Sequence, residues 1–197
     1  DDDLALLLEK KFNNEITIIN DDVLKISEDK ISNKKLIVFG NLPYNISTEI
    51  LSRWIVNLDK NFWFESLVLM FQKEVAERII AKPNTSKYGR LSILSNWKLN
   101  IKKIIDIKPK SFSPKPRVDS TLLLFTPKEN FFELKDAKNL EMITRIFFSQ
   151  RRKMLKKPFN QVFRNAKEVS EKYNIDLNLR PQNLKPETYF NLVKEYE

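Results

Sequence analysis

The sequence predicts an α/β fold, an open and mostly parallel sheet followed by a small all-helical region. Up to residue 126, short apolar and β-branched runs alternate with segments whose apolar residues recur at helical spacing, a pattern typical of open parallel sheets. From Pro127 onward we find helical spacing but no convincing strand. We therefore expect two domains, residues 1–126 with the sheet and residues 127–197 with helices only.

The individual elements follow from the periodicity of the apolar residues. In the first expected helix, Leu4, Leu7 and Leu8 share one face, and the acidic residues 1–3 stand near the positive end of the helix dipole. Ser47 and Thr48 give a cap signal for a second helix. The expected helices cover residues 3–12, 48–58, 73–81 and 91–98, and the expected strands cover residues 16–19, 36–39, 66–71, 101–107 and 118–126. Three or four more helical segments are expected beyond residue 131, broken near Pro158, Pro181 and Pro186.

The amino-acid composition limits the kinds of site and partner that we expect for this chain. The 197 residues include no cysteine and no histidine and carry a net charge of +9. Because the commonest metal ligands and the commonest general base are absent, we expect no metal site, and the lack of cysteine is typical of a reducing cytoplasm. The positive charge favours a polyanionic partner such as nucleic acid. No apolar run approaches the ~20 residues needed to cross a bilayer, so we expect no membrane partner.

The segment Asn41-Leu42-Pro43-Tyr44 follows a short apolar run and has the composition of a site for an adenine amino group. The Asn41 side chain can accept one hydrogen of an exocyclic amine. The Leu42 carbonyl can accept the other, since Pro43 restricts residue 42 to extended geometry. Tyr44 offers a ring on which a flipped base could stack, a contact worth ~1–3 kcal/mol. The alternative is a turn that closes a strand, with Tyr44 in the core.

Residues 41–48, Asn-Leu-Pro-Tyr-Asn-Ile-Ser-Thr, resemble the KsgA family of rRNA adenine N6,N6-dimethyltransferases. Further matching segments follow in that family's order at residues 71–78, 88–92, 112–120, 148–153 and 179–182. The resemblance implies a Rossmann-like class I methyltransferase sheet with a small C-terminal all-α domain. It also implies S-adenosylmethionine as the methyl donor, with no metal.

The family's glycine-rich cofactor loop has no counterpart in this sequence. The chain contains only two glycines, Gly40 and Gly89, and neither belongs to a G-x-G-x-x-G-like turn after a strand. In the family that loop lies upstream of the point that Asp1-Asp2-Asp3 resembles. We therefore expect a partial sheet that lacks the N-terminal βαβ portion.

The resemblance also implies which residues hold the cofactor. The acid of an Asp-Val pair after the third strand resembles the family's acceptor for the cofactor's adenine amine, which gives Asp22 with the backbone amide of Val23, together with Asn41. Ligands of open α/β sheets lie off the carboxyl ends of strands, so Asp22 and Asn41 are expected to face one crevice. Asp21 is the adjacent competitor, and a helix cap or a solvated turn is the structural alternative.

Candidate RNA contacts lie in three segments. Phe112 precedes two prolines in a lysine-rich loop, where it could stack on a flipped nucleotide while cations meet phosphates. The expected RNA-binding residues are Phe112, Lys115, Arg117, Tyr88, Arg90, Arg151, Arg152 and Lys153. The alternatives are a core phenylalanine, a solvated helix end for the cluster at 151–153, and for Glu74 and Arg78 a simple intrahelical pair.

The resemblance predicts S-adenosylmethionine-dependent dimethylation of N6 of two adjacent adenosines, in a hairpin loop near the 3′ end of small-subunit (16S) rRNA. We expect a cytoplasmic monomer that takes part in biogenesis of the small ribosomal subunit. Two alternatives stay open. One is an Erm-type enzyme that methylates large-subunit rRNA, and the other is a non-catalytic RNA-binding assembly factor with the same fold.

Overall fold

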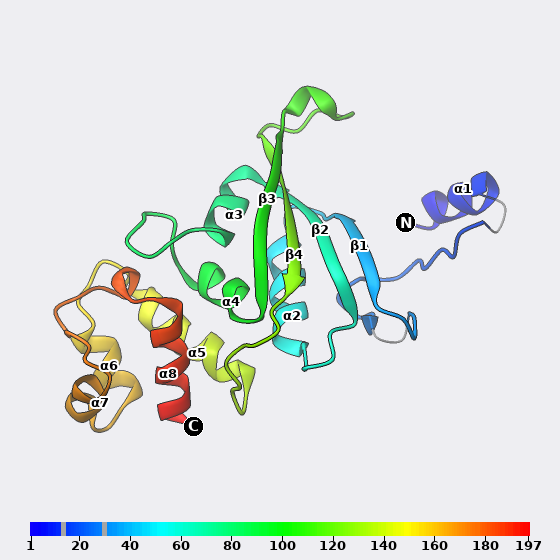
Figure 1. Ribbon diagram of the computed structural model, residues 1–197. Coiled ribbons are helices and arrows are strands. Elements are labelled where there is room, and N and C mark those ends of the chain that lie inside the picture. Colours follow the sequence, from blue (N-terminus) through cyan, green and yellow to red (C-terminus); the bar gives the residue numbers. More distant parts are fainter. Residues whose placement is uncertain (13–14, 29–30) are drawn as a thin grey trace. The chain divides into compact units, whose positions relative to one another are not determined.

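The computed structural model describes residues 1–12, 15–28 and 31–197, and the chain divides into two compact units, Asp1–Asn33 and Lys34–Glu197 (Figure 1). Each unit is described by itself. Among the described residues, no helix combines the length and the apolar character that a membrane span requires.

In the N-terminal unit, helix α1 spans Asp2–Phe12 and confirms the helix predicted there. Its first turn is capped by Asp1, whose carboxylate accepts a hydrogen bond from the backbone N–H of Leu4 at 3.0 Å. The strand predicted over residues 16–19 is wrong, because those residues belong to no strand. A strand needs a hydrogen-bonded neighbour, and no described strand pairs with this segment. Its apolar residues are correspondingly exposed, Ile16 at 48% and Ile19 at 51%.

The second unit is built on a four-stranded sheet. The strands are β1 (Leu36–Asn41), β2 (Phe64–Gln72), β3 (Leu99–Ile107) and β4 (Ser120–Pro127), in the order β1-β2-β4-β3. The β1–β2 pair is parallel, whereas β2–β4 and β3–β4 are antiparallel. The expected mostly parallel sheet is therefore a mixed one. The difference arises at β4, which runs antiparallel to both of its neighbours, β2 and β3.

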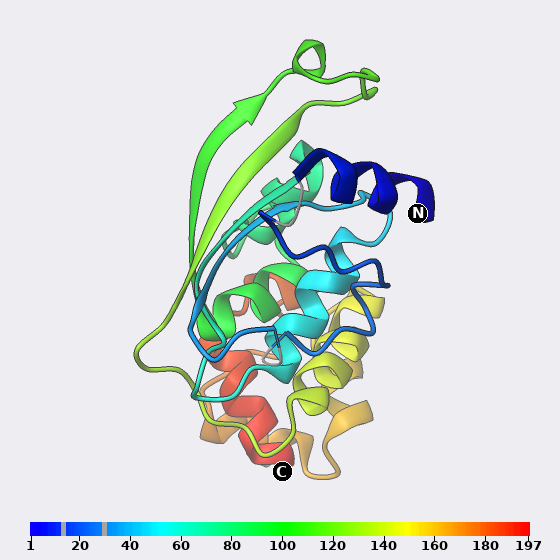
Figure 2. The ribbon, with the colours of Figure 1, turned by 90° about the vertical axis from the view of Figure 1, so that its right-hand side faces the viewer.

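Three helices cover one face of this sheet (Figure 2). They are α2 (Ser47–Asn57), α3 (Lys73–Ile79) and α4 (Arg90–Lys98), close to the predicted ranges. The apolar run of β2 packs beneath them, with Leu67, Leu69 and Phe71 fully buried. A parallel strand flanked on both sides by other strands is expected to be this apolar.

Buried Lys98 closes the end of helix α2. Its ammonium donates to the carbonyls of Ile55, at 3.3 Å, and Leu58, and it lies 3.9 Å from the ring centroid of Trp97. Burial lowers the pKa of Lys98 to about 8, an effect partly offset by Asp59. The side chain thus donates to two carbonyls at the helix end, of which that of Ile55 also accepts from the backbone N–H of Leu58 at 3.4 Å.

The C-terminal part is helical, as predicted. It contains α5 (Ala137–Ser149), α6 (Lys156–Val162), α7 (Ala166–Lys172), the 3₁₀ turn η3 (Pro181–Asn183) and α8 (Pro186–Tyr196). Its core is aromatic, with the Phe147 ring 5.4 Å from that of Phe159 and 5.6 Å from that of Tyr189. Helices α5 and α8 also contact α4, so the sheet and these helices form one compact unit. The domain boundary after residue 126 stays a prediction.

Candidate active site

The segment Asn41-Leu42-Pro43-Tyr44 begins at the carboxyl edge of the parallel strand pair. Asn41 is the last residue of β1 and stands beside Met70 of β2. Gly40 allows the close approach just before it, because a Cβ there would lie 2.6 Å from a methyl carbon of buried Leu69. Open α/β sheets bind ligands off this edge.

Both expected amine acceptors are left unused by the protein. The side chain of Asn41 is exposed. Neither that side chain nor the Leu42 carbonyl has a hydrogen-bond partner among the residues that the structure describes. The next carbonyl, that of Pro43, is occupied, since it accepts from the backbone N–H of Ile46 at 3.1 Å. This turn leads directly into α2 and leaves two neighbouring oxygen acceptors at the edge.

Tyr44 is half-buried, and its hydroxyl is anchored. The phenol oxygen lies 2.6 Å from the hydroxyl of Ser120, the first residue of β4. Its carbonyl accepts from the buried hydroxyl of Ser47 at 3.2 Å. The predicted cap role of Ser47 is therefore wrong. Ile46 occupies the N-cap position, and the Ser47 hydroxyl is turned back to the loop.

The loop between β3 and β4, residues 108–119, projects beyond the same edge of the sheet (Figure 1). Phe112 is half-buried within it, while Lys115 and Arg117 are exposed. The base is tied together by an ion pair of 2.7 Å between Lys108 and Asp119. That carboxylate raises the pKa of Lys108, so the ammonium stays charged. The loop thus presents an aromatic ring and cations near the edge where Asn41 ends.

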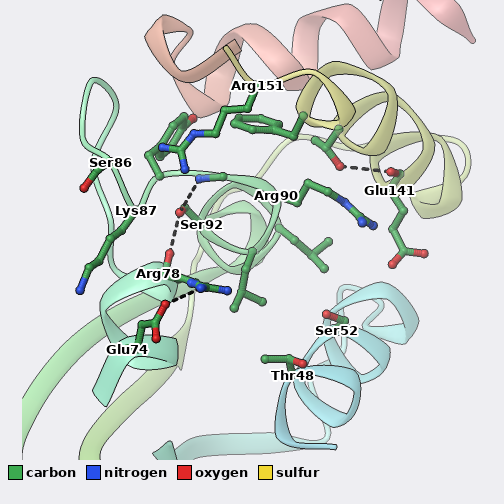
Figure 3. Close-up of a pocket in the computed structure, with 16 residues that line it drawn as sticks. Thr48, Ser52, Glu74, Arg78, Ser86, Lys87, Arg90, Ser92, Glu141 and Arg151 are labelled. Atoms are coloured by element: carbon green, nitrogen blue, oxygen red, sulfur yellow. Dashed lines mark hydrogen bonds and ion pairs between the residues drawn. The ribbon is translucent and has the colours of Figure 1, made fainter. Parts of the chain in front are cut away.

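A cavity of about 740 Å³ lies beside the first turn of α2, among α2, α3, α4 and α5 (Figure 3). Its polar lining comes from segments far apart in the sequence, and the labelled side chains in Figure 3 are Thr48, Ser52, Glu74, Arg78, Ser86, Lys87, Arg90, Ser92, Glu141 and Arg151. Arg78 and Glu74 form the intrahelical ion pair that the sequence predicted. The lining by Ser52, Lys87 and Glu141 was not predicted, since only packing brings these residues together.

One predicted RNA contact, that of Tyr88, needs correction, whereas the contact of Arg151 stays a prediction although the protein already binds part of its guanidinium. Tyr88 is fully buried and packs edge-on against Phe148, with 6.1 Å between ring centroids. Burial raises the pKa of its hydroxyl well above the ordinary value. With no exposed surface, Tyr88 cannot contact RNA in this structure, and it supports the cavity wall instead. Arg151 is half-buried, and its guanidinium donates to the Thr85 carbonyl at 2.9 Å and to the Gln182 side chain at 3.2 Å.

Arg90, Arg152 and Lys153 remain exposed, as an RNA contact requires. Arg90 opens helix α4 and lines the cavity (Figure 3). Arg152 and Lys153 lie in the turn after α5. Their roles stay predictions.

The expected cofactor residues Asp22 and Val23 belong to the N-terminal unit. One carboxylate oxygen of Asp22 accepts from the backbone N–H of Leu24 at 3.0 Å, and Asp21 accepts from the N–H of Asp22 at 2.7 Å. The turn proposed as the alternative is thus present. The other Asp22 oxygen has no partner among the described residues, so it fits the amine end of an adenine. That Asp22 faces Asn41 stays a prediction.

Neither glycine lies in a glycine-rich turn of the kind that lets the backbone approach a nucleotide-like cofactor closely. Gly40 lies inside β1, and Gly89 is the N-cap residue of α4. The cofactor roles expected of Asp22, Val23 and Asn41 stay predictions.

Comparisons with known proteins agree with this geometry. Residues 1–197 match the model of the family described as ribosomal RNA adenine dimethylase. The chain is 77% identical over its whole length to "Ribosomal RNA small subunit methyltransferase A" of Pelagibacter ubique, of which it covers 75%. It is 37% identical to the protein of that name from Prochlorococcus marinus, with 98% of this chain and 74% of the relative covered.

Solved structures show the same fold. A dimethyladenosine transferase from Plasmodium falciparum superposes with a TM-score of 0.79 at 25% identity, covering all of this chain and 79% of that one. The 23S rRNA methyltransferase ErmE superposes with a TM-score of 0.67 at 18% identity and the same coverage. At that identity the second likeness concerns the fold alone. The sheet is thus a Rossmann-like methyltransferase sheet, as the sequence predicted.

The family match over every residue, the high identity and the unused acceptors at the end of β1 lead to one assignment. The chain belongs to the ribosomal RNA adenine dimethylase (KsgA) family, whose methyltransferases take the methyl group from S-adenosylmethionine.

Proposed function

We propose that this protein dimethylates N6 of two adjacent adenosines in a hairpin loop near the 3′ end of small-subunit rRNA. The observation that carries the proposal is the pair of unused acceptors, the Asn41 side chain and the Leu42 carbonyl, beside the anchored ring of Tyr44. The choice of the small subunit is supported by the names of the two relatives from P. ubique and P. marinus.

The chemistry at these residues is orientation of an amine. The Asn41 oxygen and the Leu42 carbonyl accept the two N6 hydrogens, which draws the nitrogen lone pair out of the ring and fixes its direction. The ring of Tyr44 stacks beneath the base. S-adenosylmethionine, when bound, supplies the methyl group. Holding two reactants in line contributes up to ~7–11 kcal/mol, and the surplus amine proton passes to water, so no histidine is needed.

RNA is held by the exposed cations on either side of this edge. Lys115 and Arg117 on the β3–β4 loop, together with Arg152 and Lys153 after α5, meet phosphates, while Phe112 contacts a base. Phosphate contacts position the RNA, and the base contact selects the target. We propose that the protein acts in the cytoplasm as a monomer on a precursor of the small ribosomal subunit.

Labelled methyl transfer tests the proposal. The protein, extended to the full length of its relatives, is incubated with labelled S-adenosylmethionine and each purified subunit from cells that lack the enzyme. We expect N6,N6-dimethyladenosine in small-subunit rRNA only. Label in large-subunit rRNA would indicate an Erm-type enzyme. Tight RNA binding without label on either subunit would indicate a non-catalytic assembly factor.

A matched pair of variants separates base from phosphate contacts. Phe112→Ala should weaken binding of the specific rRNA hairpin and leave nonspecific RNA binding unchanged. Lys115→Gln should weaken both and reduce the dependence on salt. If Phe112→Ala weakened binding of the specific hairpin and of nonspecific RNA equally, Phe112 would not be a base contact to the target.

A further inference from the structure

The hydrogen bond between Tyr44 and Ser120 joins two chain segments that are 76 residues apart. Tyr44 lies in the loop after β1, whereas Ser120 begins β4 and faces Gln72, the last residue of β2. Since β2 lies between β1 and β4 in the sheet, the tyrosine side chain crosses the carboxyl end of β2 to reach Ser120. We infer that Ser120 is a positioning residue for methyl transfer, which holds the Tyr44 ring in place for the target base. This inference rests on the proposed function.

Loss of the hydrogen bond between Tyr44 and Ser120 should destabilise the protein. Ser120 has no exposed surface, and a buried hydroxyl without a partner is destabilising. Among the described residues, Tyr44 is the only recorded side-chain partner of Ser120, and Ser120 is the only one of the Tyr44 hydroxyl. Loss of either hydroxyl therefore leaves the other unsatisfied and frees the far end of the tyrosine ring.

Ser120 is itself held on both sides, so it can position Tyr44 rather than follow it. The carbonyl of Asp119 accepts from the backbone N–H of Lys73 at 2.9 Å, and its carboxylate pairs with Lys108. On the other side the Thr121 hydroxyl donates to Asp106 at 2.6 Å. These contacts tie the start of β4 to the start of α3 and to β3.

The carboxylate of Asp106 stays charged under all assay conditions near neutrality. Hydrogen bonds from Lys103, at 2.8 Å, and from Thr121 lower its pKa to about 2. The ammonium of Lys73, 3.5 Å away, acts in the same direction. The same strand start carries the loop with Phe112, so the base-stacking ring and the RNA-contacting loop share one rigid base.

Kinetics of four proteins test the inference: the full-length wild type, Ser120→Ala, Tyr44→Phe and the double variant. Each single change should lower kcat by about threefold to tenfold, the effect of one hydrogen bond, and leave the Kd for the RNA within about twofold. The double variant should be no slower than either single one, because both changes remove the same bond. Ser120→Thr, which keeps a hydroxyl, should restore most of kcat.

Ser170→Ala is the matched control, since it removes a buried serine hydroxyl on helix α7 that donates to the Lys167 carbonyl, outside the contacts that hold Ser120. Combined with Tyr44→Phe, its effect on kcat should multiply, because the two side chains do not share a bond. If the role of Ser120 were purely structural, the fold-losses of kcat in Ser120→Ala and Tyr44→Phe would multiply in the double variant. That result would overturn the inference. Unchanged kcat in Ser120→Ala would do the same.

The Asn41→Ala variant, measured in parallel, shows whether a negative result contradicts the positioning role of Ser120 or the proposed function itself. If Asn41→Ala loses methyl transfer while Ser120→Ala behaves as wild type, the positioning role fails and the proposed function stands. If Asn41→Ala keeps full activity, the proposed function of the loop fails first.

Discussion

Replacing Asn41 with alanine should remove methyl transfer while leaving the fold and the RNA affinity nearly intact. The side chain is exposed and has no hydrogen-bond partner among the described residues. The backbone of Asn41 keeps its place beside Met70 in the β1–β2 ladder whatever the side chain is. The only loss we expect is therefore an acceptor for the target amine.

The expected effect of Asn41→Ala on the free energy of unfolding is much smaller than its expected effect on kcat. Surface substitutions away from structural contacts change the free energy of unfolding by no more than ~0.5 kcal/mol. Removal of one preorganised hydrogen-bonding group from an active site typically lowers kcat by ~10²–10³, or ~2.7–4 kcal/mol. The cations proposed to meet phosphates are untouched, so the Kd for the RNA should stay within about twofold.

The assay is single-turnover transfer of labelled methyl groups to precursor small subunits, with RNA affinity from filter binding and stability from urea unfolding. Asn45→Ala is the matched control, because Asn45 is an exposed asparagine four residues further along the same loop. It should retain near-normal turnover. The reasoning would be refuted if Asn41→Ala stayed within threefold of wild type, or if both variants lost activity equally.

Three further predictions concern RNA affinity, stability and the cofactor. The double variant Arg152→Gln/Lys153→Gln should reduce the slope of log affinity against log salt by up to ~1.8, at ~0.9 per duplex phosphate. An unchanged slope in filter binding would show that these two cations lie in a solvated turn and do not contact phosphates. Lys98→Met should lower the free energy of unfolding by ~1–3 kcal/mol, because it leaves the buried carbonyls of Ile55 and Leu58 without their charged donor. Burial lowers the pKa of Lys98 from 10.5 to about 8. Between these pH values the unfolded chain therefore keeps a proton on Lys98 that the folded chain loses. The free energy of unfolding should rise with pH in this window, because the unfolded state binds more protons there. Urea unfolding at pH 7.5 and 10 should show a wild-type rise that Lys98→Met lacks, and a matching rise in the variant would contradict the assignment. The 197 residues alone should bind S-adenosylmethionine weakly, because neither glycine opens a close-approach loop, and micromolar affinity in calorimetry would refute this.

The sequence by itself determined the features that depend on neighbouring residues. Apolar periodicity located β2 and α4 to within a few residues and indicated three or four C-terminal helices without their bounds, because a helix or strand must present an apolar face wherever it packs. The segment 41–44 was likewise identifiable, since its acceptors and its ring are adjacent in the chain.

Only the tertiary structure decided the features that depend on distant partners. Residues 16–19 have strand-like alternation but form no strand, because a strand exists only with a hydrogen-bonded neighbour. Tyr88 resembled a surface residue and is buried against Phe148. The partner of Tyr44 is Ser120, 76 residues away. No local pattern encodes such pairings, because they are set by the strand order β1-β2-β4-β3, which brings the ends of β1, β2 and β4 to one edge.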